Sequence, residues 1–449
     1  MKNTHTPPDP AGPVPPAGSL PPAGPLPPAG PLPPAGPLPP AGPVPPAGSL
    51  PPAGSLVPTG PLGPTAGPAH TEQLAPARPL APAGSLSPTG PEPRHARGER
   101  PDRPVAPAGR RVLQLGPASG TVSPRAVAVG FAGLAATLAV AVVSIGHGSF
   151  TIAPGDVVQV LLGGGTTAQK LIVLDLRLPR ILVALLVGAA LAVSGALTQT
   201  FARNPLASPD VLGVTHGASL GAVAVIVLGF SSSAVPLAAL AGALVTTVLV
   251  YALAWRRGID GFRLVLVGIG VGEVLTAGIS WFLVRAEIVD ATRATIWLNG
   301  SVAGAEWSQV RPLAVALVVL LPLAVATAFT LQAMQFDDDV SQALGVRLQL
   351  ARLAVVLTAV ALAAAAVAAA GPIEFVAFFV PQIALRLCGG SRPPLLVSAI
   401  LGALLVVAAD LAARTVLPDR ELPVGLVTAI IGAPYLLWLL VRVNRRVSA

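Results

Sequence analysis

Apolar stretches near the C-terminal end of the chain are interrupted at glycine and proline, in GPIEFVAFFVPQIALRLCGG (371–390) and ELPVGLVTAIIGAPYLLWLL (421–440). Between them, Asp410 and Arg414 lie one helical turn apart at the end of a third apolar stretch. Because lipid cannot satisfy broken backbone hydrogen bonds or solvate charges, such features are tolerated where they face protein or an aqueous path. This pattern predicts a polytopic membrane protein with a translocation route.

The composition supports this class and excludes several others. The chain is 53% hydrophobic and only 11% charged, whereas a soluble domain carries about 25% charged residues. Cys388 is the single cysteine and the five histidines form no cluster, so we expect no disulfide framework and no protein metal site. The net charge of +8 comes without a basic helix or an aromatic-interleaved basic patch, so we expect no nucleic-acid partner.

Residues 1–110 form a low-complexity segment in which the hexapeptide Val/Leu-Pro-Pro-Ala-Gly-Ser/Pro recurs seven times. Proline removes backbone donors and glycine resists ordering, so we expect a disordered Pro/Ala/Gly-rich tail ahead of a membrane domain at 111–449. The tail is either a linker or ligand for a proline-binding domain, or a dispensable extension created by an early start codon. It does not resemble a signal peptide, so the first membrane helix is expected to direct insertion.

The rest of the chain predicts an all-α membrane protein, a bundle of about ten transmembrane helices, because its apolar blocks of about 20 residues match the thickness of the hydrocarbon layer. Arginines flanking these blocks favour cytoplasmic N- and C-termini for a multi-pass protein of the cell membrane, although several arginines remain on the outer side. The predicted spans are 126–146, 181–201, 212–230, 234–255, 263–284, 311–332, 352–370, 375–388, 395–413 and 424–442.

Five motifs in a fixed order carry a resemblance to a known family. They are RLPR (177–180), RNPLASPDVLG (203–213), ALGV (343–346), GPIEFV (371–376) and ELPVGLVTAIIGAP (421–434). Together they resemble the FecCD-type permease family, the membrane subunits of ABC importers for ferric siderophores, haem and cobalamin. The resemblance covers about 113–449.

The resemblance implies a set of partners. Two permease subunits, identical or paralogous, would form a pathway at their shared interface in the lipid bilayer. A separate ATPase dimer would supply energy, and an external solute-binding protein would deliver the substrate. The sequence agrees that ATP is bound elsewhere, since it lacks a phosphate-binding loop of the Walker A type. We therefore expect a transport protein without a cofactor of its own, not an enzyme.

The resemblance also implies roles for particular residues. Outward arginines of the family dock onto acidic residues of the binding protein, and the matching positions here are Arg177, Arg180 and Arg414. Guanidinium suits this task because its planar fork pairs a carboxylate at two points. The family's coupling loop, which contacts the ATPase, corresponds to about 336–350. Its matching residues are Asp337, Asp338, Asp339, Ala343, Leu344 and Gly345.

Two departures from the family pattern bear on the substrate. Glu374 replaces a glycine, and Gln382, after Pro381, replaces a histidine. The Pro-Gln form resembles permeases for catecholate siderophores more than those for cobalamin. A ferric siderophore is therefore the expected cargo, with cobalamin, haem or another metal chelate as the alternative.

Each candidate residue also has a plainer interpretation. Arg177 and Arg180 could be interfacial residues that extend toward water, and Arg414 could simply pair with Asp410 one turn earlier. Asn204 and Pro205 are better explained as packing and turn elements than as substrate ligands. Intramembrane carboxylates such as Glu273 and Glu374 are pathway candidates by default, but they could also be neutral and hydrogen-bonded between helices.

Two rival classes remain open. A proton-driven secondary transporter could use Glu273, Glu374 and Asp410, and would survive loss of an ATPase. Alternatively, the proline-rich tail could be the active part of an interaction protein, with the helices as its anchor. Ten helices are far more than an anchor requires.

Overall fold

The computed structural model describes residues 111–115, 118–148, 150–256, 261–333, 347–390, 392–417 and 420–447. All of them belong to one of the chain's two units, His95–Ala449. The predicted tail at 1–110 lies outside the described residues, so its disorder and its boundary with the membrane domain stay predictions.

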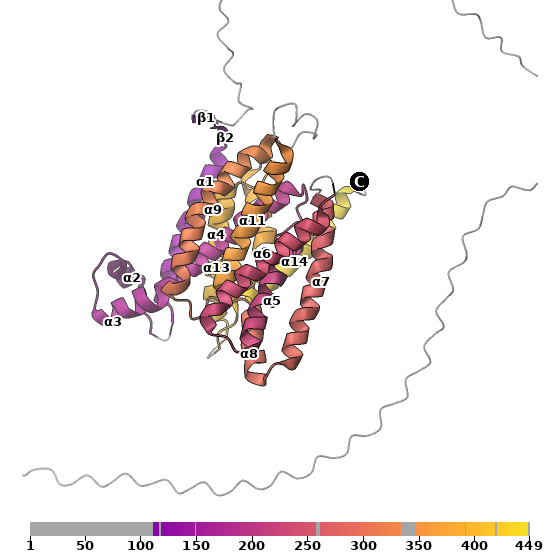
Figure 1. The fold of residues 1–449 in the computed structure, drawn as a ribbon. Coiled ribbons are helices and arrows are strands. Elements are labelled where there is room, and N and C mark those ends of the chain that lie inside the picture. Colours follow the sequence, from indigo (N-terminus) through magenta and orange to yellow (C-terminus); the bar gives the residue numbers. More distant parts are fainter. Residues whose placement is uncertain are drawn as a thin grey trace, which may run out of the picture. The chain divides into compact units, whose positions relative to one another are not determined.

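All ten predicted spans fall on helices, which run side by side as a bundle (Figure 1). Seven helices of the described residues are long and apolar enough to cross a membrane, and three apolar helices are shorter: α5, α12 and the Val424–Trp438 part of α14. The predicted all-α membrane fold is confirmed. The helices are α1 (Pro124–Gly146), α4 (Leu178–Phe201), α5 (Val214–Val227), α6 (Val235–Ala254), α7 (Gly261–Arg285), α9 (Trp307–Ala333), α11 (Leu348–Ala370), α12 (Val376–Cys388), α13 (Leu395–Thr415) and α14 (Val424–Val447).

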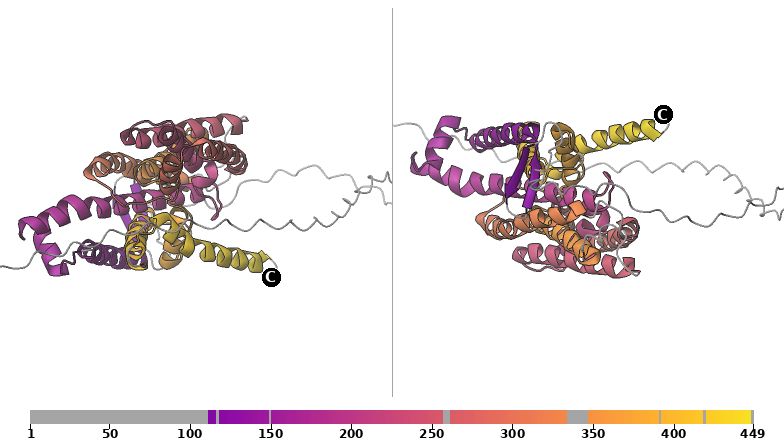
Figure 2. Two further views of the ribbon diagram at one scale, coloured as in Figure 1. Left: turned by 90° about the horizontal axis from the view of Figure 1, so that it is seen from below. Right: turned by 90° about the horizontal axis from the view of Figure 1, so that it is seen from above.

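Several short elements were not expected from the sequence, because they are too short for a periodic pattern. A two-stranded antiparallel hairpin, β1–β2, precedes α1. In Figure 2, α2 and α3 project beyond the start of α4, and the end of α14 extends away from the other helices. The short elements are β1 (Arg111–Leu115), β2 (Ala118–Val122), α2 (Pro154–Leu161), α3 (Thr167–Lys170), the π-helical turn η1 (Leu171–Arg177), the 3-10 turns η2 (Asp210–Leu212) and η3 (Ser232–Ala234), and α8 (Ile288–Leu298).

Helix α4 is the centre of the bundle. It packs against α13, α11, α12 and α9, and 78% of the most apolar part of its span is buried, against 17% for α1 and for α7. Gly188 of α4 faces Gly402 of α13 so closely that an added Cβ on either would collide with the other's carbonyl oxygen. Small residues allow this backbone contact, which supplies packing energy where the hydrophobic effect between helices is absent.

The helix breaks near the C-terminal end bring three loops together. The Gly425 N–H donates to the Gly300 carbonyl at 3.1 Å, and the Ser301 N–H donates to the Ala370 carbonyl at 2.8 Å. Gly371 has a φ of 70° and Phe375 a φ of 67°, so the chain turns sharply before α12. These bonds satisfy backbone groups that the interrupted helices leave free, as a membrane interior requires.

Candidate functional site

A charged cluster lies where α4 begins and α13 ends. Asp410 is completely buried, and its Oδ1 accepts from Nε and Nη2 of Arg180 at 3.0 and 2.9 Å. On its other side, Nη2 of Arg414 lies 3.0 Å from Oδ2 of Asp410. Nη1 of Arg180 also donates to Oε2 of Glu421 at 3.0 Å, and the Glu421 side chain is 53% exposed. One buried carboxylate thus holds two arginines, and an exposed one covers the outer side of Arg180.

The same cluster fastens the end of α1. Arg177 donates to the carbonyl oxygens of Ile145 at 2.7 Å and Phe150 at 2.6 Å. Arg414 donates to the carbonyls of Ser144 and His147, both at 3.3 Å, and to the Ser144 hydroxyl. The last carbonyls of a helix have no intrahelical partner and carry partial negative charge, so arginine is well suited to cap them.

The structure therefore brings together the three arginines for which docking was predicted. Only 13% of the Arg180 side chain and 9% of the Arg414 side chain is exposed. The pairing of Arg414 with Asp410, which the sequence left as an alternative, is present. Glu421, which the sequence analysis did not single out, is a member of the cluster. Glu421 is the first residue of the ELPVG motif, and this position could have identified it as a candidate site residue.

A second polar contact joins α4 to α12. Nε2 of Gln382 donates to Oε1 of Gln199 at 2.7 Å, and Nε2 of Gln199 donates to the Phe378 carbonyl at 2.6 Å. Both side chains are buried, as is Pro381 inside α12. Gln382 is thus a helix–helix contact within this chain. Its partner Gln199 was missed, because nothing in the sequence links positions 183 residues apart.

A third polar group gathers around the start of α5. The Asp210 carboxylate accepts from the Thr215 hydroxyl, and burial raises its pKa, because a charged carboxylate is poorly solvated there. Glu374 reaches solvent, but partial desolvation by the surrounding protein and repulsion from Asp210 raise its pKa, while His216 opposes them. The buried Nδ1 of His216 has no hydrogen-bond partner in the described part of the chain. Asp210 lies inside the RNPLASPDVLG motif but was not predicted as a site residue.

The remaining candidates divide between turn and surface positions. The Asn204 side chain accepts from the Leu206 N–H at 2.9 Å, which makes Asn204 and the exposed Pro205 part of a turn after α4. Glu273 is exposed on α7, and Glu374 is exposed in the loop before α12. Among the described residues, no group of three or more His, Cys, Asp or Glu side chains could hold a metal ion.

The predicted coupling loop falls largely outside the described residues. Asp337, Asp338, Asp339, Ala343, Leu344 and Gly345 all belong to the stretch 334–346, which the structure does not describe. The final residues of the predicted loop, from Leu348 onward, form the first turn of α11. The role of the loop stays a prediction.

Known proteins resemble this chain over most of its helical part. The profile of the FecCD transport family matches residues 136–442. The ferric enterobactin transport system permease protein of Escherichia coli (strain K12) is 40% identical over 300 residues, which span 67% of this chain and 91% of that protein. The iron(3+)-hydroxamate import system permease protein of Bacillus subtilis (strain 168) is 39% identical, over 67% of this chain and 93% of that protein.

A solved structure shares the fold. It is described as a metal-chelate type ABC transporter in an inward-facing conformation. The match has a TM-score of 0.63 at 28% sequence identity, and it covers 70% of this chain and 99% of that one.

Proposed function

The chain belongs to the FecCD transport family as a multi-pass permease of the iron-siderophore and metal-chelate ABC importers, and we propose that its cargo is a ferric siderophore of the catecholate type. The ferric enterobactin and iron(3+)-hydroxamate permeases among its relatives support a siderophore. The Pro381–Gln382 pair supports the catecholate type. ATPase and binding-protein partners follow from membership of an ABC importer.

The convergence of Arg177, Arg180 and Arg414 carries the proposal for how substrate arrives. Three guanidinium groups gather at one end of α4 and α13, and of the two described acids that pair with them, Asp410 is buried and Glu421 is exposed. We place this end outside the cell, with both termini in the cytoplasm. A carboxylate of the solute-binding protein would displace Glu421 from Arg180, while Asp410 keeps the guanidinium in position.

The exposed face of α7 supports a second permease subunit. Glu273 lies on this face, within a span of which only 17% of the most apolar part is buried. A carboxylate facing hydrocarbon is costly, so a protein or an aqueous pathway beside α7 is the more stable arrangement. We propose that a second permease, identical or paralogous, covers α7 and that the chelate passes between the two.

Uptake of radiolabelled iron tests the function. Cells lacking this gene would be offered ferric catecholate, ferric hydroxamate, haem-bound iron and, separately, labelled cobalamin. We expect loss of ferric catecholate uptake alone, restored by the full chain and by a copy lacking residues 2–110, which would make the tail dispensable. Loss of cobalamin uptake alone would overturn the cargo but keep the fold and the mechanism.

The energy source is tested in the same cells. Removing the ATPase partner should abolish uptake, and an uncoupler that leaves ATP intact should not. The opposite result would favour the proton-driven class that relies on Glu273, Glu374 and Asp410.

A further inference from the structure

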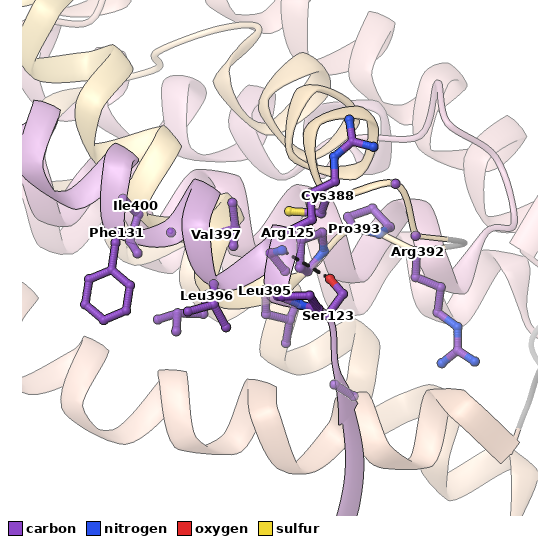
Figure 3. A pocket seen from close by; sticks show the side chains of 18 of the residues that line it. Ser123, Arg125, Phe131, Cys388, Arg392, Pro393, Leu395, Leu396, Val397 and Ile400 are labelled. Atoms are coloured by element: carbon purple, nitrogen blue, oxygen red, sulfur yellow. Dashed lines mark hydrogen bonds between the residues drawn. The ribbon is translucent and has the colours of Figure 1, made fainter. Parts of the chain in front are cut away.

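A cavity of about 1040 Å³ lies at the end of the bundle opposite the arginine cluster. Helices α1 and α13 begin at this cavity and end at the cluster, while α4 begins at the cluster and ends here with Leu197 and Thr200. Figure 3 shows its walls, with Phe131, Leu396 and Ile400 toward one side and Arg392 toward the other. Cys388, the chain's single cysteine, also lines it.

The mouth of the cavity is positively charged. Arg125 and Arg392 line it, no described lining residue is acidic, and neither arginine has a hydrogen bond or ion pair with a described residue. Partial burial lowers the pKa of Arg392, because its guanidinium loses part of its hydration and no described anion compensates for the loss. Two guanidinium groups beside one cavity, with no acid among its described lining residues, are an attractive site for an anion.

Helix α13 adds backbone donors at the same place. It begins at Leu395, after Pro394, and no side chain caps its first turn. The leading N–H groups of a helix have no intrahelical acceptor and carry partial positive charge, so they favour a phosphate. By contrast, Ser123 caps α1 by accepting from the Ala126 N–H at 3.1 Å. The uncapped helix start and the two arginines are separate features that attract the same kind of ligand.

The wall that continues from the mouth is apolar and faces away from the protein. Val127, Phe131 and Leu134 recur at helical spacing along α1 and are 42%, 71% and 43% exposed. Leu396 on α13 is 74% exposed beside them. In a membrane-spanning chain this surface meets acyl chains, so a ligand with an anionic head and an apolar body matches both parts of the cavity.

We propose that this cavity is a binding site for an anionic phospholipid, whose phosphate lies between Arg125, Arg392 and the start of α13 and whose acyl chains lie along α1. With both termini in the cytoplasm, the lipid belongs to the cytoplasmic leaflet. The site lies apart from the arginine cluster and from the pathway proposed beside α7. This proposal therefore does not depend on which chelate is transported.

Native mass spectrometry of the purified full-length chain tests the head-group contacts. The protein would be exchanged into mixed micelles with equal amounts of phosphatidylglycerol and phosphatidylcholine. A basic residue near a lipid surface contributes about fivefold in affinity, so Arg392→Gln should lower phosphatidylglycerol retention about fivefold and Arg125→Gln/Arg392→Gln about 25-fold. Arg256→Gln removes an exposed arginine outside the cavity and should change nothing.

A second variant tests the cavity without altering charge. A Cβ at Gly130 would lie 3.8 Å from Cγ2 of Val397, an ordinary contact, so Gly130→Leu adds a side chain to the cavity without a backbone collision. It should reduce retention of both phosphatidylglycerol and phosphatidylcholine at this site, because the added side chain occupies space for their acyl chains. The unfolding temperature should stay near that of the parent. Gly155→Leu, in α2 and outside the cavity, is the matched control, because nothing lies within 4 Å of a Cβ at that position.

Leu396→Cys, made in a chain that also carries Cys388→Ser, supplies a readout at the site itself, because Leu396 is 74% exposed whereas Cys388 is buried. Phosphatidylglycerol should slow labelling of the introduced thiol by a maleimide, and it should not do so when Arg125→Gln and Arg392→Gln are also present. Equal retention of both lipids, or unchanged retention in the double variant, would overturn the proposal. Equal protection by glycerol phosphate would also overturn it, in favour of a soluble anion. Protection that needs a second protein subunit and no lipid would assign the surface to that subunit.

Discussion

The guanidinium of Arg180 donates from both Nε and Nη2 to Oδ1 of Asp410, across 230 residues of sequence. The contact joins the start of α4 to the end of α13, the two helices whose backbones also touch at Gly188 and Gly402. Arg414 completes the pairing from within α13. A buried carboxylate with two arginines is therefore part of what holds this end of the bundle together.

Asp410→Asn should destabilise the bundle strongly. It removes the buried anion shared by two partly buried guanidinium groups and leaves Arg180 only the exposed Glu421, and breaking a buried ion pair typically costs about 3–5 kcal/mol. Thermal unfolding in detergent measures the change. Asp290→Asn is the control, because the Asp290–Arg293 pair is 3.5 Å apart with a 70% exposed arginine, and such surface pairs contribute about 0–1 kcal/mol. Equal effects of the two variants would contradict a structural role for the cluster.

Gly188→Val should prevent close packing of α4 on α13. The added side chain would collide with the Gly402 backbone, which cannot move aside as a flexible side chain would. We expect at least the loss of about 1–3 kcal/mol typical of an overpacked core, seen as a lower unfolding temperature and less monodisperse protein on gel filtration. Gly155→Val, in α2, introduces the same residue where nothing lies within 4 Å and should be tolerated.

The Gln199–Gln382 contact predicts non-additive substitutions. Gln382→Leu leaves a buried amide oxygen of Gln199 without its donor, at a cost of about 1–3 kcal/mol. Gln199→Leu/Gln382→Leu removes both partners, so it should destabilise the protein less than the sum of the single changes. A double-mutant cycle from thermal unfolding measures this, and strict additivity would mean that the two amides do not interact in the membrane.

Glu421→Gln should strengthen docking of the solute-binding protein. The substitution removes the anion that covers Nη1 of Arg180, while Asp410 still orients the guanidinium. Affinity would be measured with the permease in nanodiscs. Glu306→Gln is the control, since Glu306 is exposed at the same end of the bundle, next to Trp307, whose ring N–H donates to the Leu174 carbonyl at 3.3 Å. Weaker docking in Glu421→Gln would place the binding protein elsewhere.

Gly345→Trp should uncouple ATP hydrolysis from transport. Gly345 belongs to the predicted coupling loop, and a bulky side chain there would disturb its contact with the ATPase. Hydrolysis and chelate uptake would be measured together in liposomes that contain the whole importer. Leu249→Trp adds the same bulk to an exposed position on α6 and should leave coupling intact. Normal coupling in Gly345→Trp would show that the contact with the ATPase lies elsewhere.

Local features allowed much of the fold to be predicted. All ten predicted spans fall on helices, and seven of the described helices are long and apolar enough to cross a membrane, because helix formation in lipid depends on runs of apolar residues and on local glycine and proline breaks. The family resemblance then selected Arg177, Arg180 and Arg414, which the structure brings to one end of the bundle. The short elements β1, β2, α2, α3 and α8 were missed, since they lack length and periodicity.

The sequence by itself determined which apolar segments form helices, where these helices break and to which family the chain belongs. Only the tertiary structure decided which polar groups meet: Arg180 with Asp410 and Glu421, and Gln199 with Gln382. It also decided that Arg125 and Arg392 line one cavity. The reason is physical, because a helix forms from contacts within a few residues, whereas partners far apart in sequence are set by how whole helices pack.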